Sequence, residues 1–100
     1  MAVEIRWSDE ALTTFDENVE YLLKEWSEKE VSRFVDQTSR VLKRLAIFPE
    51  SYPVGTVSQK YRKAKLNKYI VLFYSYRKTA KKITLITFWN VKQNPAKLGF

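Results

Sequence analysis

Residues 69–76 read YIVLFYSY and residues 83–89 read ITLITFW, and these two segments decide the fold. Both are rich in β-branched and aromatic residues, which favour extended backbone, so both are predicted to be strands. The polar segment 77–82 between them is short, which predicts a turn and an antiparallel pair. The second segment is apolar enough for a strand that is central or covered on both faces.

Two further strands are predicted on the N-terminal side. Residues 60–66 precede Asn67, a residue that favours a tight hairpin turn into the segment beginning at Tyr69. Residues 3–7 alternate apolar and polar side chains, which is typical of a short strand with one buried face. Residues 50–58 contain Pro53 and Gly55 and are predicted to form a loop.

Two helices are predicted between the first strand and that loop. Ser8 is a suitable N-cap, and Asp9 and Glu10 then lie in the first turn, where negative charge favours the helix dipole. The apolar residues that follow have a spacing close to 3.6, which predicts one buried stripe: Leu12, Phe15, Val19, Leu22, Leu23 and Trp26.

The second helix is predicted to begin at a capping box. Ser27 and Glu30 have the S-x-x-E spacing in which each side chain bonds the other residue's backbone N–H. Pro49 disfavours helical geometry at the residue before it, so this helix ends there. Helices joined so tightly pack antiparallel. The predicted fold is therefore α+β, in the order β-α-α-β-β-β: a helical hairpin on a small, mostly antiparallel sheet, in one domain spanning 1–100.

The composition excludes several kinds of chemistry. The chain has no cysteine and no histidine, which excludes thiolate nucleophiles, zinc fingers and Ser-His-Asp triads. Any catalysis must use Lys, Arg, Tyr, Ser, Thr or carboxylates. The apolar segments are far shorter than the ~20 residues of a membrane-spanning helix, and no signal peptide is evident. We therefore expect a cytoplasmic protein without a membrane partner, metal or cofactor.

Charge is divided along the chain. Residues 1–50 carry 7 Lys and Arg against 11 Asp and Glu, whereas residues 51–100 carry 11 Lys and Arg and no acid. Uncompensated cations attract phosphates and carboxylates through space, which indicates a polyanionic or acidic partner. The alternative is that the acidic helices fold over the basic half and balance it, while the other lysines serve solubility.

Taken together, the order and spacing of these features resemble the RelE/ParE toxin superfamily, and within it the ParE-like subgroup of plasmid stabilisation proteins. The resemblance covers nearly the whole chain. It rests on the short first strand, two helix endings, a pattern in the strand region and the last strand's ending. These are YLLKEWS at 21–27, LKRLAIFP at 42–49, the pattern Arg62, Leu66, Tyr69 and Phe73-Tyr74, and FWNVKQNP at 88–95.

The resemblance implies the toxin of a type II toxin–antitoxin system, neutralised by a cognate antitoxin whose C-terminal segment wraps around it. Members of the superfamily either poison DNA gyrase or cleave messenger RNA on the ribosome, and the shared fold does not decide between the two. Our leading hypothesis is a growth inhibitor that acts on gyrase. The alternatives are a metal-independent mRNA endonuclease and a non-toxic relative that binds nucleic acid or protein. A homodimer or a toxin–antitoxin hetero-oligomer is the expected assembly.

The candidate site residues are mainly cations. Lys63 and Lys65 match the K-x-K of the RNA-cleaving branch, and a period of two puts them on one face of a strand. Clustered cations stabilise the charge of a phosphorane, so Arg62, Lys63 and Lys65 are the catalytic candidates if the chain is an endonuclease. The same three residues, with Trp89 and Lys92, are the target-binding candidates. The alternative is an edge strand that its lysines protect from aggregation.

Three departures from the RNA-cleaving pattern favour the gyrase hypothesis. Ile70 stands where the resemblance implies an arginine directly after the hairpin tyrosine. Only Lys92 lies near the position where an arginine is implied after the last strand, and a lysine lacks the bidentate guanidinium. No tyrosine follows Tyr76 to stack on a base.

Overall fold

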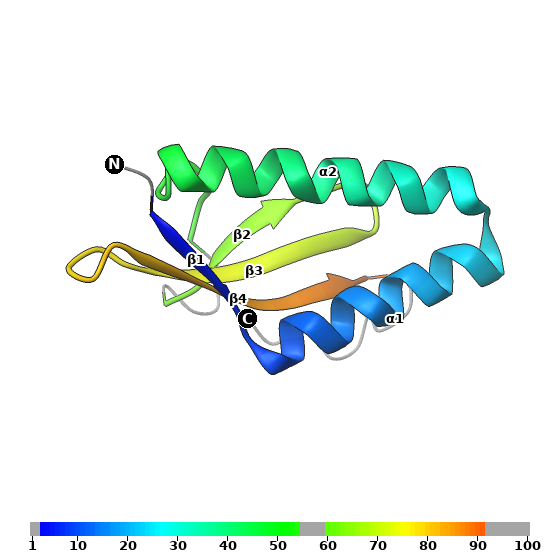
Figure 1. The fold of residues 1–100 in the computed structure, drawn as a ribbon, viewed down its shortest axis with the longest axis horizontal. Helices are drawn as coiled ribbons and strands as arrows, with labels where there is room; N and C mark the ends of the chain where they lie inside the picture. The colour runs from blue at the N-terminus through cyan, green and yellow to red at the C-terminus, as the bar shows by residue number, and fades with distance from the viewer. Residues whose placement is uncertain (1–2, 55–59, 92–100) are drawn as a thin grey trace.

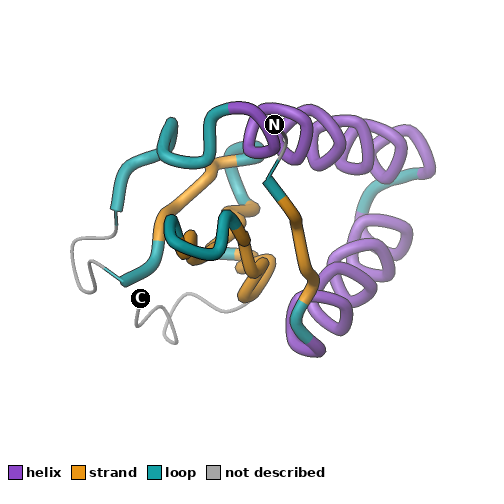
Figure 2. Tube along the Cα trace, turned by 60° about the vertical axis from the view of Figure 1, so that its left-hand side comes forward, coloured by secondary structure: helices purple, strands orange, loops and turns teal. Residues whose placement is uncertain are grey.

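The computed structural model describes residues 3–54 and 60–91 of the chain. Its elements, in order, are β1 (Glu4–Trp7), α1 (Asp9–Glu25), α2 (Glu28–Ile47), β2 (Arg62–Lys65), β3 (Ile70–Arg77) and β4 (Lys82–Asn90). The two helices form an antiparallel pair on one side of the strands (Figures 1 and 2). This arrangement confirms the predicted α+β fold and its element order.

The four strands form a sheet in the order β1-β4-β3-β2. β3 pairs antiparallel with β2 and β4, and β1 pairs parallel with β4. The apolar β4 is therefore an inner strand, as predicted, and β2 lies at one edge. Asn67 shapes the turn between β2 and β3, because its side-chain oxygen accepts hydrogen bonds from the backbone N–H groups of Tyr69 and Ile70, at 2.9 and 3.0 Å.

Most strand boundaries differ from the predicted ones by one or two residues. β2 ends at Lys65, because the next two backbone N–H groups both donate to the Ile70 carbonyl and so close the turn. The second hairpin is tighter than expected, because Arg77 and Lys82 still pair with each other and only residues 78–81 form the turn.

The helix starts confirm one prediction and correct another. Ser8 caps α1 as expected, and its hydroxyl accepts a hydrogen bond from the Ala11 N–H at 3.0 Å. The capping box predicted for α2 is wrong, because the Ser27 side chain makes no capping hydrogen bond. Ser27 is fully extended, with φ −165° and ψ 170°. The Glu30 carboxylate pairs instead with Arg33, 3.4 Å away.

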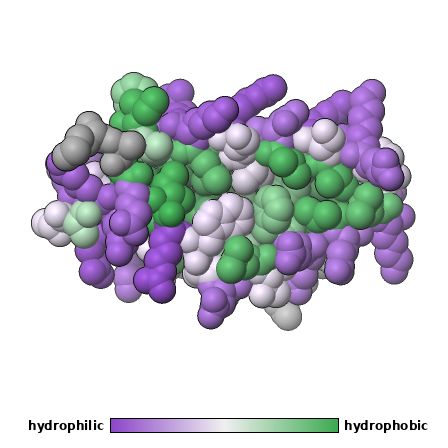
Figure 3. All heavy atoms as spheres, viewed as in Figure 1, coloured by the Kyte–Doolittle hydropathy of each residue, from purple (hydrophilic) through white to green (hydrophobic). Residues whose placement is uncertain are grey.

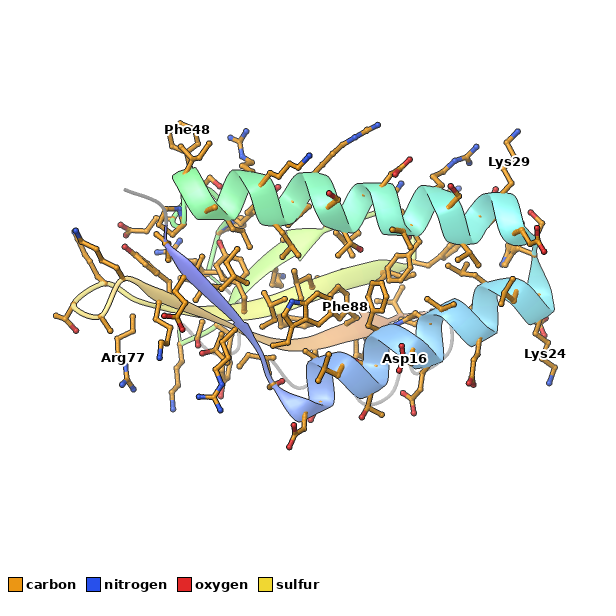
Figure 4. The ribbon with its side chains drawn as sticks, in the orientation of Figure 1. Asp16, Lys24, Lys29, Phe48, Arg77 and Phe88 are labelled. Atoms are coloured by element: carbon orange, nitrogen blue, oxygen red, sulfur yellow. The ribbon has the colours of Figure 1, made fainter. Side chains whose placement is uncertain are left out.

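The core lies between the helix pair and the sheet. Four aromatic rings, from β1, α1, α2 and β4, form its centre, with neighbouring ring centroids between 5.1 and 6.1 Å apart. They belong to Trp7, Phe15, Phe34 and Phe88. Figure 4 shows Phe88 between the sheet and the helices. Burying one such ring stabilises the fold by roughly 2–3 kcal/mol, so this cluster fixes the helices on the sheet.

Polar side chains of α1 complete the hydrogen bonding of β4 beyond the end of β1. The Phe88 N–H donates to the Thr14 hydroxyl at 2.9 Å, and the Phe88 carbonyl accepts from the Asn18 amide at 3.0 Å. Asn90 in turn donates to the Asn18 side-chain oxygen at 3.1 Å. Asn18 is only 2% exposed. Helix α1 therefore takes the place of a strand along this part of β4.

Candidate functional site

One face of the sheet points away from the helices, and three predicted site residues share it. In the strand register, Lys63 pairs with Phe73, Lys65 with Val71, and Val71 with Trp89. Residues paired directly across strands project to the same face. The alternate residues, Ala64 and Leu72, lie in the core on the helix side. Lys63, Lys65 and Trp89 therefore lie together on the opposite face, which we term the basic sheet face.

Other cations extend this face toward β1 and the β3–β4 turn. Arg6, Arg77 and Lys82 alternate with core residues on their strands and so project to the same side. Arg6, Lys65 and Arg77 are exposed, and Lys63 and Lys82 are partly buried. Among the described residues of the strands, Glu4 is the one acidic side chain. The face therefore carries a clear excess of positive charge.

The acidic residues lie on the helices instead. Six of the 11 acids are on α1 and three on α2, which leaves Glu4 and Glu50. The helices pack on the other side of the sheet, so they do not cover the basic sheet face. The sequence left open whether the acidic half balances the basic half. The fold places the two on opposite layers, which strengthens the field on the strand side.

Arg62 is held away from the two lysines. It pairs with Tyr74, whose ring is in the core, and its guanidinium donates to the Tyr52 carbonyl at 2.7 Å. Longer contacts of 3.4 and 3.5 Å reach the Glu50 carbonyl and carboxylate. Arg62 therefore fixes residues 50–52 against β2, and the fold gives it a positioning role.

Tyr74 lies beside this tether. Its side chain is fully buried, and its hydroxyl donates to the Pro49 carbonyl at 2.9 Å. Burial raises the pKa of Tyr74 to about 12, against an opposing effect of the Arg62 charge. The neutral phenol is therefore the stable form near pH 7, and Tyr74 is a structural hydrogen-bond donor there.

The remaining candidates lie at the end of β4. Trp89 is partly buried, and its Nε1–H is enclosed without a hydrogen-bond acceptor within the part of the chain that the structure describes. Lys92 lies outside the described residues. The position occupied by Ile70 is informative, because this side chain is 1% exposed and belongs to the core on the helix side.

A hollow that the sequence reasoning missed lies between the helix pair and the β2–β3 turn. Its volume is about 310 Å³, and its lining includes Trp26, Gln37, Lys68 and Tyr69. The Trp26 and Tyr69 rings stack with their centroids 6.5 Å apart, and Trp26 is 51% exposed. We term this hollow the Trp26 pocket. A large aromatic residue at the tight helix–helix junction was the one signal in the sequence that pointed to it.

An apolar surface runs from this end of the molecule along the two helices. Figure 3 shows hydrophobic side chains gathered along the middle of this face, between hydrophilic ones on either side. Leu12 and Leu23 of α1 and Val35 of α2 are 51%, 50% and 44% exposed. Large side chains at this exposure on both helices are typical of a surface that a partner covers.

Two further features are absent from the described residues. In residues 3–54 and 60–91, no group of three His, Cys, Asp or Glu side chains is placed to hold a metal ion. Neither helix described there is long and apolar enough to cross a membrane.

Residues 5–95 match the family model of the ParE toxin of the type II toxin–antitoxin system parDE. No curated protein sequence matches the chain.

Solved structures resemble the fold at low sequence identity. A chromosomal ParDE toxin–antitoxin system from P. aeruginosa matches with a TM-score of 0.71 and 11% identity, over 89% of this chain and 96% of that one. The YoeB/ParE toxin from Agrobacterium tumefaciens matches with a TM-score of 0.62 and 10% identity, over 87% and 96%. The E. coli DinJ–YafQ toxin–antitoxin complex matches with a TM-score of 0.61 and 12% identity, over 93% and 97%.

Proposed function

The chain belongs to the ParE toxin family of type II toxin–antitoxin systems, and we propose that it inhibits growth by acting on DNA gyrase. The observation that carries the choice of target is the identity of residue 70, an isoleucine without positive charge. The resemblance places a phosphate-contacting arginine there in the RNA-cleaving relatives. Ile70 is 1% exposed and belongs to the core, and its apolar side chain offers no positive charge to a phosphate.

The basic sheet face is the target-binding surface in this proposal. Lys63 and Lys65 supply positive charge, and Trp89 adds an aromatic ring at the end of β4. Arg62 contributes indirectly, because it holds residues 50–52 against β2. Lys92 follows β4 in the sequence and lies outside the described residues. A surface of this kind binds an acidic target through its field and through charge-assisted hydrogen bonds.

Neutralisation by a cognate antitoxin is the second part of the proposal. The Trp26 pocket and the exposed apolar residues of the helices suit a segment that places apolar side chains on them, as amphipathic helices do in hydrophobic grooves. Acidic groups elsewhere on the same antitoxin would meet Lys63 and Lys65. The similar DinJ–YafQ structure from E. coli is a toxin–antitoxin complex, which agrees with a partner of this class.

Expression in bacteria tests the proposal as a whole. Induction of the chain alone should stop growth and raise an SOS response, and co-expression of the protein encoded beside it should restore growth. The SOS response follows because a poisoned gyrase leaves double-strand breaks. Normal growth with confirmed folded protein would contradict the proposal.

Transcript mapping separates the gyrase target from the endonuclease alternative. In that alternative Lys63, Lys65 and Arg62 cleave RNA, and new transcript ends appear within codons soon after induction. The proposal predicts DNA breaks without such ends. New transcript ends without an SOS response would assign the chain to the RNA-cleaving branch.

A substitution in the Trp26 pocket tests the antitoxin surface separately. Trp26→Ala should weaken antitoxin binding by about 10-fold or more, because large aromatic side chains dominate interface energies. It should leave toxicity in the absence of antitoxin unchanged. Thr13→Ala is the matched control on an exposed site of α1. Equal antitoxin affinity in the two variants would place the antitoxin elsewhere.

A further inference from the structure

The hairpin that joins β3 to β4 projects from the body of the molecule (Figure 1). Its end, residues 77–82, reads RKTAKK, and we term it the β3–β4 tip. Residues 77–81 are exposed, and Figure 4 shows Arg77 pointing away from the body. The apex between the lysines consists of the small residues Thr79 and Ala80.

The tip carries four cations and little to balance them. Lys82 approaches Glu4 with an Nζ–Oε2 distance of 3.7 Å, but the two side chains are 40% and 67% exposed, so the pair contributes little. Arg77, Lys78 and Lys81 have no acidic partner among the described residues. The tip is therefore a concentrated positive charge on a narrow projection.

Two features of the tip are unfavourable for the isolated fold. Arg77 and Lys82 are direct cross-strand partners, and like charges in this position repel. Lys81 has φ 50°, in the left-handed region that glycine or asparagine occupies at lower cost. The residues concerned, Arg77, Lys81 and Lys82, all add positive charge to the same end of the hairpin. Cations at positions where they oppose the local structure point to a function.

The backbone of Lys81 is held in this conformation. Its N–H donates to the Lys78 carbonyl at 3.2 Å, and its carbonyl accepts from the Glu4 N–H at 3.1 Å. Strand β1 thus anchors the turn from the side. The lysines of the tip project from a fixed frame, which lowers the entropy lost when they bind.

We propose that the β3–β4 tip binds duplex DNA, with the hairpin end in the major groove and its lysines on the flanking phosphates. A two-stranded ribbon fits the major groove of B-DNA, and the small side chains at the apex allow close approach to the base edges. The major groove of A-form RNA is too narrow for such a ribbon. The tip contains no aromatic residue on which a single-stranded base would stack.

The composition of the tip also disfavours an acidic protein as its partner. Protein interfaces centre on aromatic and apolar side chains and are depleted in lysine. The tip has three lysines, one arginine and no large apolar residue. The inference concerns direct contact with DNA and does not depend on which enzyme the toxin inhibits.

Binding to a labelled DNA duplex of about 20 base pairs tests the inference, with fluorescence anisotropy measured between about 50 and 200 mM salt. The test variant is Lys78→Gln with Lys81→Asn, because asparagine tolerates the left-handed backbone. The control is Lys24→Gln with Lys29→Gln, which removes two exposed lysines at the other end of the molecule (Figure 4).

The tip variant should bind DNA much more weakly than the control. Each lost phosphate contact reduces the salt slope by about 0.9, which corresponds to roughly 10-fold in affinity near 0.1 M salt. The expected loss is therefore about 50- to 100-fold for the tip variant, against less than about 3-fold for the control. Equal losses in the two variants would overturn the inference.

Competition identifies the partner class. Unlabelled duplex DNA should displace the probe at lower concentration than duplex RNA, single-stranded DNA or polyglutamate of equal charge. Displacement by duplex RNA or single-stranded DNA as readily as by duplex DNA would overturn the assignment to duplex DNA. Displacement by polyglutamate at equal charge would assign the tip to an acidic protein instead.

A single glycine substitution gives an independent readout. Lys81→Gly relieves the left-handed backbone and should raise Tm by about 4 °C while it lowers DNA affinity roughly 10-fold. Opposite changes in stability and binding show that the lysine is retained for its charge. A higher Tm with unchanged affinity would contradict this.

Discussion

At the scale of single residues, the two neighbours Arg62 and Lys63 do different work. Arg62 faces the helix side and donates to the Tyr52 carbonyl at 2.7 Å, while Lys63 lies on the basic sheet face. The period of two along a strand separates adjacent side chains in this way. One basic segment thus supplies both a structural tether and part of the proposed binding surface.

Removal of the tether should lower stability without altering charge on the basic sheet face. Arg62→Ala breaks a charge-assisted hydrogen bond to a partly buried carbonyl and should lower the free energy of unfolding by about 1–2 kcal/mol. Lys63→Ala should lower it by less than about 0.5 kcal/mol. Urea denaturation of both variants measures this difference, and equal effects would refute the positioning role.

Tyr74 should make the fold sensitive to alkali. Its folded pKa of about 12 lies above the ordinary value of 10.0, so the folded state retains a proton that the unfolded chain loses. The stabilisation is full below pH 10 and is lost as the pH rises through 12, by roughly 2–3 kcal/mol in total. Unfolding free energies of Tyr74→Phe and the natural chain, measured from pH 9 upward, should converge. Parallel curves would contradict this account.

The sequence predicted the residues that share the basic sheet face better than it predicted their separate contacts. Lys63 and Lys65 lie on one face because alternation is a local rule, and their strand is at the sheet edge, as the alternative reading supposed. The partner of Arg62 is a carbonyl in a loop ten residues earlier, which no local pattern specifies. The Trp89 Nε1–H, which has no acceptor among the described residues, likewise depends on three-dimensional packing.

At the scale of elements, α1 acts as a cover for the edge of β4. Ser8 begins the helix and also donates from its hydroxyl to the Ile86 carbonyl at 3.0 Å. Thr14 and Asn18 continue this contact roughly two and three turns further along. Exposed strand edges invite pairing between molecules, so a helix that satisfies the edge protects the monomer from aggregation.

The buried amide of Asn18 should be essential to this cover. Asn18→Leu leaves the Phe88 carbonyl and the Asn90 amide without this partner, and it should cost about 2–4 kcal/mol. Glu17→Ala, an exposed neighbour on the same helix, should cost less than about 0.5 kcal/mol. Thermal unfolding compares the two variants. An Asn18→Leu variant with nearly unchanged stability would show that the edge of β4 needs no such cover.

Apolar periodicity located both helices, whereas the details of their starts were less predictable. Ser8 and Ser27 look equally suited to capping in the sequence, yet only Ser8 uses its side chain as a cap. Ser8 is held by its contacts with β4, while Ser27 lies in a tight junction with extended backbone. A capping motif states which hydrogen bond is available, and the tertiary fold decides whether it forms.

At the scale of the whole molecule, the fold converts a charge difference along the sequence into a charge difference across layers. The helices carry nine of the 11 acids, and the cations of the strands gather on the other side of the sheet. In our proposal, the antitoxin covers the apolar surface on the helix side, and the acidic target binds on the strand side. It follows that toxicity and antitoxin binding should respond differently to substitutions on the two sides.

Charge reversal on the basic sheet face should therefore reduce toxicity. Lys63→Glu with Lys65→Glu replaces attraction by repulsion, and induced cultures should grow at close to the uninduced rate. The matched control, Lys24→Glu with Lys29→Glu, makes the same charge change at the end of the helix pair and should stay toxic. Equal toxicity of both variants would show that Lys63 and Lys65 do not bind the target and only keep the edge strand solvated.

The most direct test of the gyrase proposal uses purified gyrase and a closed circular plasmid. With the natural chain present, gyrase should leave linear, protein-linked DNA, and the variant with Lys63→Glu and Lys65→Glu should give much less. A plasmid that stays intact with the natural chain, together with messenger RNA cut on ribosomes by the same preparation, would contradict the account.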